Sequence, residues 1–181
     1  DAFNKYLLSS LNKNQKAKSI FMPRSSGSLV NMGSGLFTFD PTTHKLVKDL
    51  EKWHCLDIFD ANINELMEAS VVMFQRMRLP AIYCVSDEVV VNFIRGICQQ
   101  YRVTNAYHNF THAFAVMHMV FSLVRKAKIY PLGQLDVLAM LVAAVCHDVD
   151  HPGTDNDFEV QCQTDLAITY NDTSVLENHH V

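Results

Sequence analysis

The segment that most constrains this chain is HDVDHPG, residues 147–153, which stands at the end of an apolar run. It places two imidazoles and two carboxylates in five consecutive positions, and Pro152-Gly153 then ends any helix that precedes it. Neighbouring histidine and aspartate side chains can reach one metal ion, and a carboxylate can bridge two ions. The sequence therefore predicts a buried helix that carries a metal site at its C-terminal end.

A second histidine pair, His108 and His112, lies upstream in the sequence YHNFTH. At the start of a helix these two residues, four apart, share one face. Imidazole and carboxylate together suit zinc, and a mixed carboxylate and water environment suits magnesium or manganese. None of the five cysteines forms a CxxC pair, which argues against a structural zinc finger. Two such ions could hold a phosphate and generate a hydroxide nucleophile, so we expect a metal-dependent hydrolase.

Composition narrows the class of protein further. A chain of 181 residues that is 49% hydrophobic suits one domain, or part of a larger one, with a sizeable core. The net charge of −4 gives no support for binding to nucleic acid or to a membrane surface. We find no signal peptide and no apolar run long enough to span a bilayer. Buried free thiols in a reducing compartment are the simplest interpretation of the cysteines, so we expect a cytoplasmic protein. Membrane association through regions outside this chain stays open, and so does the oligomeric state.

The apolar periodicity predicts an all-α fold, a compact multi-helix domain without strand pairs. Helices are expected over about 45–53, 63–74, 86–101, 112–128 and 132–146, the last apolar nearly all round and therefore buried. Ser174 and Glu177 match a capping box that opens a further helix. Residues 1–43, rich in Ser and Gly in their second half, are expected to form a weakly ordered leader, and residues 44–181 the domain itself.

Several polar residues have ordinary explanations. His44, His54 and His118 are expected to be core or surface residues without a role in the site. Asp150 is either a turn residue or a carboxylate that supports the metal site. Glu177 can cap a helix, serve the site, or do both.

Three motifs stand in the order and spacing of the class I cyclic nucleotide phosphodiesterase catalytic domain. They are YHNxxH from Tyr107, HDVDHPGxxN from His147 and YNDxSVLENHH from Tyr170. Over about residues 53–181 the chain resembles the N-terminal portion of that domain, which has an HD-type helical fold. The resemblance implies hydrolysis of 3′,5′-cyclic nucleotides, cAMP, cGMP or both, to 5′-monophosphates.

The resemblance also implies a role for each motif residue. His112, His147 and Asp148 look like ligands of a tightly held ion, usually zinc, and Asp148 would bridge to a second ion, usually magnesium or manganese. His108 looks like the general acid that protonates O3′ after a hydroxide bridging the two ions attacks phosphorus. The remaining roles are orientation of the ligands and metal-bound water (His151, Glu177 and His180) and lining of the substrate pocket (Tyr107 and Asn156).

The family's catalytic domain is about twice as long as this chain. A further aspartate ligand and the glutamine that holds the purine are expected beyond Val181. The isolated 181-residue chain is therefore expected to be truncated, inactive and poor in stability. Two other functions stay open, an HD-type metal phosphohydrolase on another nucleotide and a non-catalytic nucleotide-binding regulator. The YHN element and the intact motif residues argue against them.

Overall fold

The computed structural model describes residues 45–52, 56–126 and 132–181, and within these ranges every regular element is a helix. The all-α prediction is thus confirmed for the described part of the chain. The expected leader, His44 and His54 lie outside the described residues. The division into a leader and a domain at residues 43 and 44 therefore stays a prediction.

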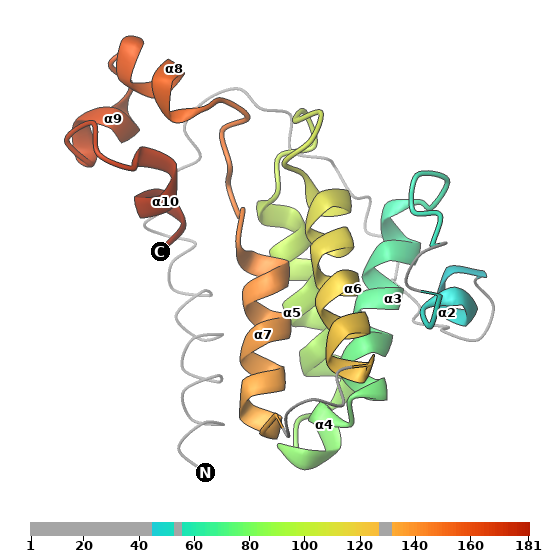
Figure 1. Ribbon diagram of the computed structural model, residues 1–181. Helices are drawn as coiled ribbons and strands as arrows, with labels where there is room; N and C mark the ends of the chain where they lie inside the picture. Colours follow the sequence, from blue (N-terminus) through green and yellow to red (C-terminus); the bar gives the residue numbers. More distant parts are fainter. Residues whose placement is uncertain (1–44, 53–55, 127–131) are drawn as a thin grey trace.

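Four long helices stand side by side and form a bundle (Figure 1). Helix α3 packs against both α5 and α6, and α6 packs against α7. Their bounds are Ile63–Arg76 (α3), Asp87–Gln100 (α5), Phe110–Lys126 (α6) and Gln134–Cys146 (α7). Two short helices accompany α3, namely α2 (Lys45–Asp49) and α4 (Leu79–Ile82).

Three short helices form a separate group beyond the C-terminal end of α7 (orange to red in Figure 1). They are α8 (Asn156–Gln161), α9 (Asp165–Thr169) and α10 (Val175–His180), and they pack on one another. The segment 147–155, which carries the HDVDHPG sequence, joins this group to α7. That segment therefore lies between two packed units of the fold.

Side-chain caps explain where two of the long helices begin. Asn62 accepts hydrogen bonds from the backbone N–H groups of Asn64 and Glu65, and Glu65 accepts one from the backbone of Asn62, which completes a capping box for α3. The Asn109 side chain accepts from the N–H groups of Thr111 and His112. Helix α6 therefore starts at Phe110, two residues before the expected position.

The core of the bundle is apolar and tightly closed. Its largest fully buried side chains in the long helices come from α3, α5, α6 and α7: Leu66, Val71, Met73, Ile94, Phe114, Met117, Phe121, Leu141 and Val145. Burial of this surface is the main stabilising contribution, because it removes apolar area from water.

Helix α7 departs from the expectation that it is buried on all sides. Val137, Leu141 and Val145 face the core, but Leu135 is 60% exposed and Met140 is 39% exposed. The cause is its position at the edge of the bundle, where α6 is its main helical neighbour in the described part of the chain. The thiols also differ from expectation: Cys98 is buried, whereas Cys84 and Cys162 are exposed.

The helix expected after Ser174 does form, but the hydrogen bonds of its expected capping box are absent. Ser86 precedes α5 without a side-chain cap bond. Ser174 has φ 42°, a left-handed conformation that does not aim its hydroxyl at the N–H of Glu177. Instead, Asn156 accepts a hydrogen bond from the N–H of Leu176, at 2.9 Å, and caps α10 from a different helix.

Among the described residues, no helix combines the length and the apolar character needed to cross a membrane.

Because Phe114 is buried and Phe59 is exposed, replacing each with alanine should change the free energy of unfolding by very different amounts. Phe114→Ala, at a fully buried site, should lower the free energy of unfolding by about 3–5 kcal/mol, because it removes buried area and leaves a cavity. Phe59→Ala, at a side chain that is 89% exposed, should change it by less than about 0.5 kcal/mol. Urea denaturation followed by circular dichroism measures both, and equal losses would show that Phe114 is not a core residue.

Candidate metal centre

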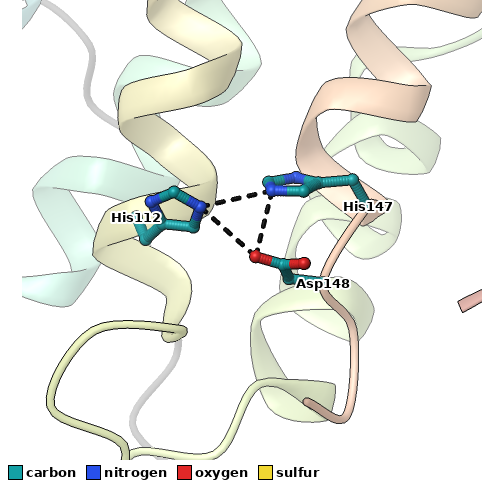
Figure 2. Close-up of side chains that lie close together, drawn as sticks. All are labelled: His112, His147 and Asp148. Carbon is teal, nitrogen blue, oxygen red and sulfur yellow. Dashed lines mark hydrogen bonds and ion pairs between the residues drawn. The ribbon is translucent and has the colours of Figure 1, made fainter. Parts of the chain in front are cut away.

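Two elements that are distant in sequence bring His112, His147 and Asp148 together. His112 lies in the first turn of α6, and His147 and Asp148 follow directly after the last residue of α7. Figure 2 shows the three side chains pointing toward one another across the gap between the two helices. The packing of α6 against α7 therefore creates the cluster.

The distances within this cluster suit a single small cation. His112 Nε2 lies 3.2 Å from His147 Nε2 and 3.3 Å from Asp148 Oδ2, and His147 Nε2 lies 3.0 Å from the same Oδ2. A tetrahedral ion with bonds of about 2.0–2.1 Å separates its ligands by about 3.3–3.4 Å. Three donors of the types that zinc accepts are thus already near the required spacing.

The orientation of His147 is fixed by its own helix. Its Nδ1 lies 2.9 Å from the carbonyl oxygen of Ala144, to which only an N–H can donate. In the neutral ring this places the proton on Nδ1 and leaves the lone pair of Nε2 facing His112 and Asp148. A histidine ligand commonly holds its second nitrogen in this way.

The electrostatics of His112 favour the neutral form. Partial burial lowers the pKa of His112, and the charges of His147 and His108 lower it further, against the opposing effect of Asp148. Since only neutral imidazole binds a metal, the site does not need to lose a proton from His112 near neutral pH.

A second group shares Asp148 with the first. The ligand atoms of Asp148, His151 and His180 also lie within 4.8 Å of one another. His180 Nδ1 donates to the carbonyl of Val149 at 3.1 Å, so its buried and unpaired Nε2 is an acceptor. His151 Nδ1 instead accepts from the N–H of Gly153 at 3.0 Å, which leaves Nε2 of the neutral ring as a donor. His151 is thus better suited to hydrogen-bonding water than to ligating an ion.

Burial is the main cause of the pKa shifts in this second group. It lowers the pKa of His151 and that of His180, and each also has a neighbouring histidine that lowers it further. The lowered pKa values favour the neutral form of both rings, which is the form in which His180 Nε2 accepts and His151 Nε2 donates.

His108 lies beside the cluster but outside both groups. Its ring stacks on the His151 ring, with centroids 3.8 Å apart and planes 10° from parallel, and its centroid is 5.7 Å from that of His112. The side chain is half-buried at the edge of the site. His108 is therefore an imidazole near the cluster that is not among the groups able to hold the ion.

The other predicted site residues take different positions. Tyr107 is 64% exposed, and its ring centroid lies 4.5 Å from that of His112. Asn156 donates to Glu177 Oε2 at 3.0 Å while it caps α10, so both ends of its amide are engaged in joining α8 to α10. The hydrogen bond from Asn156 lowers the pKa of Glu177 and keeps that carboxyl ionised.

Asp150 and His118 both lie outside the two groups of candidate ligands. Asp150 forms an ion pair with Arg102, at 2.8 Å, and has φ 61°, so it is a turn carboxylate outside both groups. His118 is buried and bonds the carbonyl of Leu50 at 2.8 Å, which confirms its ordinary role in the core.

Sequence reasoning missed Tyr101 and Asn105, whose side chains bond the backbone of the metal-site segments. Tyr101 fits the apolar pattern of α5, and Asn105 fits a turn. Nothing in their local sequence indicates partners more than 40 residues away.

Comparison with known proteins agrees with this geometry. The helical fold is similar to that of solved phosphodiesterase domains. The sequence profile of the 3′5′-cyclic nucleotide phosphodiesterase family matches residues 107–181. The resemblance drawn from the three motifs is thereby confirmed.

Individual relatives extend the match upstream. The 3′,5′-cyclic-nucleotide phosphodiesterase regA of Dictyostelium discoideum is 39% identical over 163 residues, which cover 88% of this chain and 20% of that protein. The human high affinity cGMP-specific 3′,5′-cyclic phosphodiesterase 9A is 35% identical over 118 residues, 65% of this chain and 20% of that protein. The crystal structure of the phosphodiesterase domain of the RhoPDE fusion protein from the choanoflagellate Salpingoeca rosetta superposes with a TM-score of 0.67 at 33% identity, over 72% of this chain and 41% of that one. The chain thus spans about a fifth of the length of these curated relatives, and less than half of the solved domain.

Removal of one ligand should abolish the metal site. Asp148→Ala takes away the carboxylate that both groups share, so we expect loss of tightly bound metal, measured by inductively coupled plasma mass spectrometry after gel filtration. Asp157→Ala, on the exposed side of α8, is the matched control and should retain the wild-type metal content. Unchanged metal in Asp148→Ala would show that this carboxylate is not a ligand.

Proposed function

We propose that the protein containing this chain hydrolyses 3′,5′-cyclic nucleotides to 5′-monophosphates at a centre of two divalent cations. The observation that carries the proposal is the convergence of His112 Nε2, His147 Nε2 and Asp148 Oδ2, at 3.0–3.3 Å, in a chain whose residues 107–181 match the phosphodiesterase family. Because this chain covers only part of its relatives, the activity is assigned to the whole protein.

The residues divide into two tasks at the centre. His112, His147 and Asp148 would hold the first ion, for which two imidazoles and a carboxylate favour zinc. Asp148 would also face a second ion, and its oxygen chemistry favours magnesium or manganese there. When bound, the ions would supply Lewis acidity toward the phosphate oxygens and lower the pKa of water that attacks phosphorus.

His108 is the residue best suited to act as general acid. It is an imidazole next to the cluster that is not needed as a ligand, and it stacks on His151, which restricts its ring. Its charged form can donate a proton to the ribose O3′ as the P–O3′ bond breaks. The protonated form of His108 is restored by a proton from solvent between turnovers.

The supporting residues act on orientation. His151, with Nε2–H as donor, and His180, with Nε2 as acceptor, can orient water at the second ion. Glu177 contributes through Asn156, because their hydrogen bond joins α8 to the helix that carries His180. Tyr107 is exposed beside His112, where its ring can contact a bound nucleotide, and Asn156 supports the same wall of the site.

The substrate is proposed at the level of the class. The names of the relatives include a cGMP-specific enzyme and a dual specificity enzyme, so they do not point to one nucleotide.

Hydrolysis of cAMP and of cGMP is the direct test of the proposed function. The full-length protein should release 5′-AMP, 5′-GMP or both, and a chelator should remove the activity until zinc and magnesium are restored. Absence of turnover by folded, metal-loaded protein would favour a nucleotide-binding regulator or a different phosphohydrolase.

Substitution of His108 separates acid catalysis from metal binding. His108→Ala should lower kcat by about 10²–10⁴-fold, the usual contribution of a general acid, while the content of both metals stays at the wild-type level. A nucleotide analogue with a better leaving group at the 3′ position should recover part of the loss, since it needs less protonation. Loss of metal in this variant would instead make His108 a ligand.

A further inference from the structure

The connection between α5 and α6 is bonded to the metal-site segment at several points. Tyr101 and Asn105 belong to this connection, which runs from residue 101 to 109, and their partners lie at residues 145–151. Helix α5 itself contributes the carbonyl of Gln100, which accepts from the N–H of Asp150 at 3.2 Å. The segment that carries His147 and Asp148 is therefore held along its length by residues that are not themselves ligands.

Tyr101 contacts the backbone on both sides of His147. Its hydroxyl donates to the carbonyl of Val145 at 3.0 Å and accepts from the N–H of Asp148 at 3.3 Å. The side chain is 4% exposed, and its ring packs edge-on against Phe110 with centroids 6.1 Å apart. Burial raises the pKa of the Tyr101 phenol, so it stays protonated and able to donate. One hydroxyl thus fixes the end of α7 and the backbone of Asp148 together.

Asn105 performs a similar task for the two other histidines. Its Nδ2 donates to the carbonyl of His108 at 3.0 Å and to that of His151 at 2.8 Å. A Cβ added at Gly153, where φ is +92°, would lie 2.6 Å from Asn105 Oδ1, so the close approach of this amide requires glycine there. The bonds tie together the two backbones whose rings stack at 3.8 Å.

We propose that Tyr101 and Asn105 are positioning residues that set the metal affinity of the centre by holding the backbones of Asp148, His108 and His151. The inference rests on the proposed function, since it assumes that His112, His147 and Asp148 bind an ion. Neither side chain belongs to a group of candidate ligands, and both act through backbone groups.

The physical reason is pre-organisation. Asp148 belongs to both candidate groups, and it lies outside the helix, where the hydrogen bonds of α7 no longer restrain it. Without the Tyr101 hydroxyl, the carbonyl of Val145 and the N–H of Asp148 both lose a partner. The carboxylate then samples more positions, and part of the binding free energy is spent on ordering it. Outer partners of metal ligands commonly change metal affinity by about 10–100-fold.

The test uses Co²⁺ as a spectroscopic probe in the full-length protein stripped of metal. Tyr101→Phe removes only the hydroxyl and keeps the ring that packs on Phe110. We expect about tenfold weaker binding of Co²⁺, with a changed visible absorption that reports altered coordination geometry. Asn105→Asp keeps the volume but replaces the donor with a carboxylate that faces two carbonyl oxygens, so it should also weaken binding. Ser70→Ala removes a buried hydroxyl that bonds Leu66 within α3 and has no bond to the metal-site segments, so it should leave affinity and spectrum at wild-type values.

Circular dichroism first shows which variants are folded, and one folded variant is enough to test the positioning role. Weaker binding with an altered spectrum in the folded variant, but not in Ser70→Ala, supports the inference. Wild-type affinity and spectrum in folded Tyr101→Phe and Asn105→Asp would overturn it while leaving the metal centre intact. Failure of the wild-type protein to bind Co²⁺ would overturn the metal centre itself and this inference with it.

Discussion

The packing of α6 against α7 is the contact on which the site depends. The apolar faces of these helices meet in the core, and their ends then place His112 beside His147 and Asp148. The polar groups at the site are brought together by burial of Phe114, Leu141 and Val145, because hydrophobic packing supplies most of the folding free energy. Without that packing, the two imidazoles and the carboxylate would be hydrated separately and would not be held together.

The end of α7 is the second determinant. Three features follow Cys146 in order: a histidine fixed by the carbonyl of Ala144, an aspartate shared between two candidate groups, and a turn through Asp150 at positive φ. The carbonyls of the last helical turn have no partner within the helix, so one of them can hold His147. Beyond the helix the chain can bend, as it does at Asp150. The segment then leads to α8–α10, which return His180 to the site through its bond to Val149.

The sequence predicted the long helices well because their signal is local. Apolar residues at three- and four-residue steps located α3, α5, α6 and α7, with differences of a few residues at their ends. The motif residues were identified by their chemistry and spacing, and the structure brings His112, His147 and Asp148 to a common point.

The exposed side of α7 was missed because an apolar run does not reveal which neighbouring helices are present. The cap of α10 was misassigned to Ser174 because the side chain that accepts the cap hydrogen bond belongs to Asn156, which is 20 residues away from Leu176. Tyr101 and Asn105 were missed for the same reason, since contacts between distant residues leave no local pattern.

The central claim is that one ion binds between α6 and the end of α7. X-ray diffraction from crystals of the full-length protein grown with zinc, collected on both sides of the zinc absorption edge, locates such an ion directly. The account predicts an anomalous peak at about 2.0–2.2 Å from His112 Nε2, His147 Nε2 and an oxygen of Asp148. A zinc peak elsewhere, with these three side chains left unligated, would contradict it.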